Sequence, residues 1–199
     1  MPKASPLSDR PPVVLACRLD APLQVRFRWL GDRFRHDVES VSGERRALML
    51  VSDEGLEGAR ELSTPALQQL HCEDRPDGVR VALLVGMSGR DHWSLSVEAL
   101  SDGRTLTFDA ACRCSARDAV CLSRYWLGDD RVGAPVESPG GTTWELAGWR
   151  LTTVTAGALP AAQLEVQPSR CTIRPPPPPH SAGAASVTWR WKYTIALDP

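Results

Sequence analysis

The sequence predicts an all-β protein, an internally duplicated antiparallel β-sandwich. Three observations predict it. Apolar and polar residues alternate along much of the chain, turns that contain glycine separate the alternating segments, and short motifs recur in one order. Alternation with a period of two is typical of strands that bury one face. Few segments have the helical period of about 3.6 residues, so we expect mainly strands.

The first expected hairpin covers residues 24–38 and turns at Gly31-Asp32. Glycine suits a two-residue turn because it adopts positive φ without steric cost. The turn places Trp29 opposite Phe34, and the apolar residues on either side of this pair then share one face. The polar residues, several of them arginines, pair on the other face in the same register.

A second hairpin is expected over residues 93–112, with a turn at Asp102-Gly103. Asp-Gly is one of the strongest short-range signals for a two-residue turn. The turn places Trp93 opposite Cys112. The apolar residues that alternate along both arms then face the same core.

Two further strands are expected from alternation. Segment 79–87 has valine, leucine or methionine at every second position, and a longer loop after it would place Met87 opposite Trp93. The last strand is expected over residues 187–197, where large apolar residues occupy every second position. Both segments therefore predict strands with one buried face.

Several motifs occur twice along the chain. Trp-Leu-Gly-Asp at 29–32 returns at 126–129, and Ala-Cys-Arg, Val-Glu-Ser and Cys-x-x-Arg-Pro also recur. Each second copy follows the first by about 100 residues, and the order is the same in both halves. One short match can arise by chance, but four matches in order indicate a tandem duplication.

Each copy contains a cysteine, then a tryptophan, then a second cysteine, namely Cys17, Trp29 and Cys72, and Cys112, Trp126 and Cys171. This arrangement resembles the immunoglobulin-like sandwich, in which a tryptophan packs against cysteines of two facing sheets. The resemblance implies two tandem units. It departs from the family where a tyrosine should precede the second cysteine, since Leu70 and Ser169 stand there. The alternative is one larger pseudo-symmetric sandwich or barrel.

We divide the chain into a flexible leader (1–10), a first β repeat (11–90) and a second β repeat (91–199). Within the second repeat, residues 174–183 are rich in proline. Such a run favours an extended polyproline segment, and we expect a stiff loop before the last strand.

Charge and composition narrow the classes of function. The 199 residues include 23 basic and 24 acidic ones, with a net charge of −1, which argues against electrostatic binding of nucleic acid. No apolar run reaches the roughly 20 residues of a membrane span. The N-terminal segment lacks the apolar stretch of a secretory signal, so we expect a cytoplasmic location. The oligomeric state is left open.

The six cysteines are expected to be free thiols that pack as small apolar groups. An alternative applies to Cys112, Cys114 and Cys121, because thiolates at close spacing can bind a soft metal ion such as zinc. We expect Cys121 to point away from the other two. The sequence therefore predicts neither a metal nor another cofactor.

No phosphate-binding loop, dinucleotide-binding motif or nucleophile elbow occurs in the sequence. His36 is expected in the core opposite Phe27. His92 follows Asp91, and an Asp–His pair of this kind is the basis of a hydrolase alternative. We expect a protein without catalytic residues.

The candidate contact residues are four arginines of the first hairpin, Arg26, Arg28, Arg33 and Arg35. Arg28 lies opposite Arg35, and such a like-charge pair is unfavourable unless an anion or acidic partner shares it. We predict a non-catalytic binding or assembly module that recognises a protein partner or an anionic ligand through this hairpin. The alternatives are a sandwich or barrel that binds a small molecule or carbohydrate, and a hydrolase.

Overall fold

Fifteen strands and no helix occur among residues 10–53, 65–114, 121–128, 135–138, 141–146, 148–177 and 186–198, which the computed structural model describes. The predicted all-β fold class is confirmed. Within the same ranges there is also no helix with the length and apolar character that crossing a membrane requires.

The first sheet has seven antiparallel strands. In spatial order they are β1 (Val13–Leu15), β2 (Leu23–Trp29), β3 (Phe34–Ser42), β4 (Arg45–Ser52), β9 (Ser123–Leu127), β14 (Arg170–Arg174) and β13 (Gln163–Gln167). The strands β1 to β4 follow one another as a meander, and the second half of the chain extends the same sheet.

The second sheet has eight antiparallel strands. In spatial order they are β10 (Pro135–Ser138), β11 (Gly141–Leu146), β12 (Trp149–Val154), β15 (Val187–Leu197), β8 (Thr105–Cys114), β7 (Asp91–Ala99), β6 (Arg80–Ser88) and β5 (Gln69–Asp74). The long strand β15 lies at its centre between β12 and β8.

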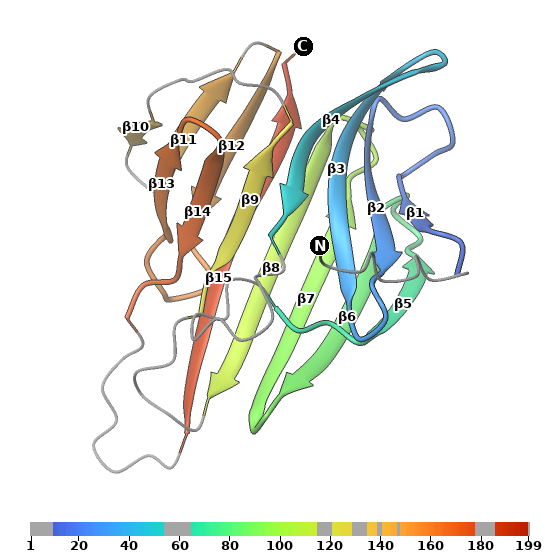
Figure 1. The fold of residues 1–199 in the computed structure, drawn as a ribbon. Coiled ribbons are helices and arrows are strands. Elements are labelled where there is room, and N and C mark those ends of the chain that lie inside the picture. The colour runs from blue at the N-terminus through green and yellow to red at the C-terminus, as the bar shows by residue number, and fades with distance from the viewer. Residues whose placement is uncertain are drawn as a thin grey trace, which may run out of the picture.

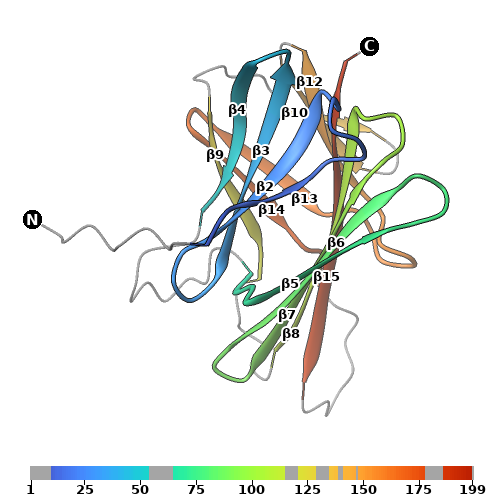
Figure 2. The ribbon, with the colours of Figure 1, turned by 90° about the vertical axis from the view of Figure 1, so that its right-hand side faces the viewer.

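The two sheets pack face to face as one continuous sandwich (Figures 1 and 2). Strands of both halves of the chain pair within each sheet, β4 with β9 in the first and β8 with β15 in the second. The inner faces share one apolar core that includes Phe27, Leu50 and Phe108. The architecture is therefore the larger-sandwich alternative of the sequence analysis.

A buried polar chain crosses this core between the sheets. His36 of β3 shares a hydrogen bond of 2.7 Å between Nε2 and the Tyr125 Oη of β9, and Tyr125 bonds in turn to the Tyr193 hydroxyl of β15. Burial, assisted by the charge of Arg35, lowers the pKa of His36 to about 3. The ring is therefore neutral, and the predicted core position of His36 is confirmed.

Both predicted hairpins have the predicted register. Trp29 pairs with Phe34 across the first turn, and their rings meet edge to face with centroids 5.0 Å apart. Trp93 pairs with Cys112 across the second hairpin. In the last strand, Trp191, Tyr193 and Ile195 are buried in the core, on the face that the sequence predicted.

The predicted register of β6 is wrong by one residue. A tight turn at Gly89, which has a φ of 60°, replaces the expected longer loop and pairs Gly86 rather than Met87 with Trp93. Leu84 therefore points into the core, while Val85 and Met87 are 48 % and 47 % exposed. Because the side chains of a strand alternate, this shift of one residue exchanges its two faces.

The topology does not confirm the immunoglobulin-like identity or the tandem duplication. Trp29 and Trp126 both lie in the first sheet, but the matched Cys72 and Cys171 lie in different sheets. All six cysteines are free thiols. The domain boundaries stay predictions, and of the proline-rich loop only residues 174–177 lie within the described ranges.

Candidate anion-binding cleft

The structure brings together three of the four predicted hairpin arginines. Arg26, Arg28 and Arg35 lie on the outer face of β2 and β3, and each of them contacts a buried carboxylate. Arg33 lies at the turn instead, where its Nη2 is 2.7 Å from Oδ2 of Asp32. Arg33 is therefore not part of the group.

Asp37 accounts for the predicted like-charge pair. Its side chain is only 1 % exposed, and its two carboxylate oxygens lie 3.0 Å from Arg28 Nε and 3.0 Å from Arg35 Nε. One buried negative charge thus bridges two neighbouring guanidinium groups. The repulsion that the register implied is reduced within the protein itself.

Glu39 holds the next group of arginines. Its carboxylate accepts hydrogen bonds from Gln24 at 2.7 Å and Arg26 at 2.9 Å, and Arg46 of β4 lies 3.6 Å away. Burial alone would raise the pKa of Glu39, but these hydrogen bonds and the charges of Arg26 and Arg46 outweigh it, and the pKa is lowered. Glu39 is therefore ionised at neutral pH.

Within this group of arginines and carboxylates, the positive charges outnumber the negative ones. Arg26 and Arg46 contact Glu39, while Arg28 and Arg35 contact Asp37, so four guanidinium groups share two carboxylates. Two positive charges remain in excess. An anionic group that approaches this face is attracted by the excess and can complete the pairing.

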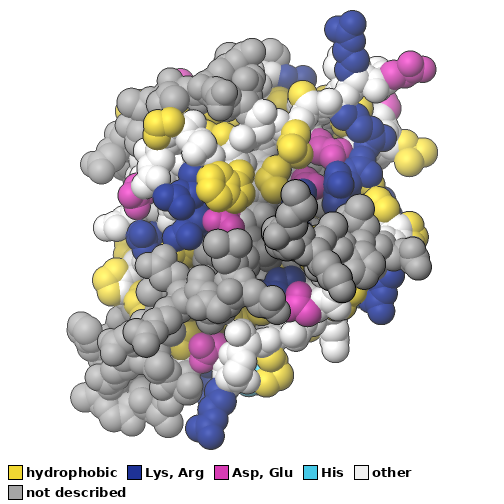
Figure 3. Space-filling model, in the orientation of Figure 1, with side chains coloured by type: hydrophobic (Ala, Val, Ile, Leu, Met, Phe, Trp, Pro, Cys, Tyr) yellow, Lys and Arg dark blue, Asp and Glu magenta, His cyan; other side chains and the backbone are white. Residues whose placement is uncertain are grey.

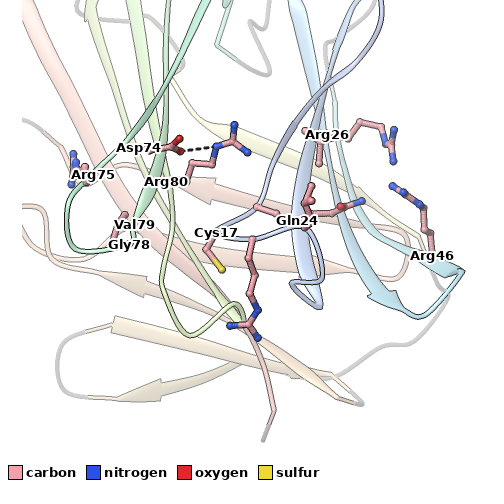
Figure 4. Close-up of a pocket in the computed structure, with 13 residues that line it drawn as sticks. Cys17, Gln24, Arg26, Arg46, Asp74, Arg75, Gly78, Val79 and Arg80 are labelled. Atoms are coloured by element: carbon pink, nitrogen blue, oxygen red, sulfur yellow. Dashed lines mark ion pairs between the residues drawn. The ribbon is translucent and has the colours of Figure 1, made fainter.

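A cleft of about 560 Å³ adjoins the same arginines, between the edge of the first sheet and the β5–β6 hairpin of the second (Figure 4). Arg26 and Arg46 lie on one side of it, and Arg75 and Arg80 lie on the other. Arg18, from the segment between β1 and β2, also contributes to the lining. Arginines from both sheets thus surround one space.

Carboxylates orient the arginines of the far wall. Arg80 Nε is 2.9 Å from Asp74, and Arg75 Nη1 is 2.9 Å from Glu98. Among the described lining residues, Asp74 is the only carboxylate. A guanidinium has five N–H donors, so one that is paired with a single carboxylate keeps further donors for a ligand.

The outer face of the first sheet continues from the arginines to an exposed aromatic ring. In Figure 3 hydrophobic side chains lie near the middle of this face, with groups of Lys and Arg on both sides. Trp126 of β9 is 44 % exposed, and the guanidinium of Arg170 lies 5.7 Å from its ring centroid. Val51 separates Trp126 from Asp37 in one cross-strand row.

A second cavity, of about 580 Å³, lies on the outer face of the second sheet. Its wall includes Val85 and Met87, the residues that the β6 register turns outward, together with His92 and Arg113. His92 and Asp91 are consecutive residues of β7, so their side chains point to opposite faces. The Asp–His pair of the hydrolase alternative therefore does not form.

The thiols of Cys112, Cys114 and Cys121 meet inside the sandwich. The Cys112 and Cys114 sulfurs are 3.1 Å apart, and the Cys114 and Cys121 sulfurs are 3.2 Å apart. The expectation that Cys121 points away is wrong, because its sulfur lies against that of Cys114 at the end of β8. Burial is the main cause that raises the pKa of Cys114 to about 12.

No family model matches this chain, and no curated protein matches its sequence. Fold and site together define an all-β sandwich with an arginine-lined cleft at one edge. Its function is therefore inferred from the geometry of that cleft.

Sequence reasoning identified Arg26 of the cleft but not Arg18, Arg46, Arg75 or Arg80. These residues lie on separate strands and loops of two sheets. No spacing along the chain marks them, because packing of the sheets brings them together. A weak signal existed in Arg45-Arg46, two consecutive basic residues directly before the apolar run 47–51.

Proposed function

We propose that this protein is a non-catalytic binding module that takes an anionic group of a ligand or partner into the arginine cleft. The observation that supports it most strongly is the convergence of arginines from both sheets on one space. Guanidinium groups recognise carboxylates and phosphates through two parallel hydrogen bonds, which suits them to this task.

The cleft is organised for binding before a ligand arrives. Glu39, whose side chain is 8 % exposed, holds the guanidinium group of Arg26 on one wall, which reduces the ordering that a ligand would have to impose. The volume of about 560 Å³ lies in the range of small-ligand pockets. A compact group with several negative charges fits both the size and the charge.

Arg18→Gln and Arg46→Gln test the proposal, because both side chains are 54 % exposed and both line the cleft. Inorganic pyrophosphate and a short glutamate peptide serve as probes in calorimetric titrations at low salt. We expect each variant to weaken binding by about tenfold, which corresponds to about 1.4 kcal/mol. Arg45→Gln is the matched control, an exposed neighbour that does not line the cleft.

Equal affinity of Arg45→Gln and Arg46→Gln for the probes would contradict the proposal, as would a wild type that binds neither probe. Binding of pyrophosphate alone would identify a phosphate site. Binding of the peptide alone would identify an acidic protein partner. In both cases, the substitutions of the cleft arginines must weaken the binding of the probe.

A second candidate function is binding of a small apolar molecule at the outer cavity of the second sheet. It is favoured by one observation, the exposure of Val85 and Met87 beside the cavity of about 580 Å³. Met87→Glu should abolish binding of an environment-sensitive apolar dye, while Leu48→Glu, a similarly exposed position on the other sheet, should not. Identical dye binding by the two variants would exclude this candidate.

A further inference from the structure

Three buried thiols form a cluster that the proposed anion-binding function does not use. Cys112 and Cys114 are completely buried and Cys121 is 5 % exposed. Their sulfur atoms all lie within 4.8 Å of one another. Three thiols from two chain segments thus converge on one point.

The fold explains why they converge. Cys112 and Cys114 are alternate residues of β8, so both side chains point to the inner face of the second sheet. Cys121 lies just before β9, the strand with which the chain enters the first sheet. The cluster therefore lies between the end of β8 in the second sheet and the start of β9 in the first.

A tetrahedral metal site requires a fourth ligand besides the three thiols. Among the described residues, the group of ligand atoms within 4.8 Å of one another consists of the three cysteine sulfurs alone. Three thiolates form a donor set that zinc accepts, and a water molecule can complete the tetrahedron.

The spacing of the sulfurs suits a zinc ion. Zinc–sulfur bonds of about 2.3 Å in a tetrahedron separate the sulfurs by about 3.8 Å. The closest sulfurs are 3.1 and 3.2 Å apart and all three fall within 4.8 Å, so small side-chain movements suffice. The ligand geometry needs no rearrangement of the strands.

The surroundings offer support to negatively charged sulfurs. Trp93 and Trp189 are the cross-strand neighbours of Cys112 on either side, and both have a buried indole N–H without a hydrogen-bond partner. A metal ion converts the Cys112 thiol to a thiolate. A thiolate is a stronger hydrogen-bond acceptor than a thiol, which favours donors in its neighbourhood.

We propose that Cys112, Cys114 and Cys121 bind a zinc ion that joins the end of β8 to the start of β9. The three thiolates are the protein ligands, and a water molecule takes the fourth position. The site lies apart from the arginine cleft, because the described residues that line the cleft include none of these three cysteines.

The test is zinc binding by the full chain, prepared under reducing conditions and measured by metal analysis and native mass spectrometry. We expect one zinc ion per chain in the wild type and an affinity at least about 100-fold lower in Cys121→Ser. Cys171→Ser is the matched control, because it removes another buried thiol that lies outside the cluster.

A measurement without variants protects the test against failure to fold. The wild type loaded with cobalt should show tetrahedral visible bands and a sulfur-to-metal charge-transfer band with the intensity of three thiolates. Substoichiometric metal in the reduced wild type would overturn the proposal. Unchanged zinc affinity in Cys121→Ser, or a Cys114–Cys121 disulfide that forms in place of metal binding, would also overturn it. None of these outcomes alters the test of the anion cleft.

Discussion

Acid should destabilise this protein before its carboxylates are protonated, because His36 must be neutral in the folded state. The folded pKa of His36 is about 3, and an unfolded histidine has a pKa of about 6.5. Between these two values the unfolded chain binds more protons than the folded one. Stability therefore falls as the pH drops below about 6.5.

The magnitude follows from the two pKa values. Each pH unit between them changes the free energy of unfolding by about 1.36 kcal/mol per group. From pH 7 to pH 5, the histidine term should remove about 2 kcal/mol. The side chain is fully inside the core, with its Nε2 committed to Tyr125, so solvent does not screen the effect.

Urea unfolding at pH 7, 6 and 5, followed by tryptophan fluorescence, measures this loss. His36→Gln keeps a polar group near Tyr125 but cannot titrate. Its stability should therefore not show the histidine loss of about 2 kcal/mol between pH 7 and pH 5. Equal pH dependence of the two proteins would refute the reasoning. An independent check is the NMR titration of the His36 ring, since a shift with a midpoint near 6.5 in the folded protein would refute it as well.

Three further predictions concern packing and charge. Leu84→Ala should lower the free energy of unfolding by about 2–5 kcal/mol, because Leu84 is buried. Leu83→Ala, on the opposite face of β6, should change it by less than about 0.5 kcal/mol. Similar losses for the two variants in chemical denaturation would mean that the β6 register is wrong. Gly86→Ala should destabilise the protein by more than about 1 kcal/mol, because a Cβ atom there would lie 1.7 Å from the Ala66 carbonyl oxygen. An unchanged melting temperature would contradict this close approach. Glu39→Gln should lower the free energy of unfolding by about 1–3 kcal/mol at pH 7. Because the pKa of Glu39 is lowered in the folded protein, its contribution to stability is lost as the pH falls through the folded pKa, so the melting temperature of the variant should be less sensitive to acid than that of the wild type. Parallel curves of melting temperature against pH would contradict this prediction.

Local alternation determined much of this fold. A register follows from the sequence where both faces of a hairpin and its turn agree, as they do around Gly31 and between Trp93 and Cys112. Alternation failed at β6, where every second position is apolar but neighbouring positions are apolar too. There the two-residue turn at Gly89 and the close approach at Gly86 decide which face is buried.

The candidate sites were decided by tertiary structure. Sequence reasoning recognised Arg26 and the three clustered cysteines as polar or thiol groups of interest, since residue chemistry can be read from the chain. It did not place Arg46 and Arg80 around one cleft, because they belong to different sheets. It also turned Cys121 away from its partners. Strand periodicity fixes only the face on which a side chain lies, whereas the packing of the two sheets fixes which distant side chains meet.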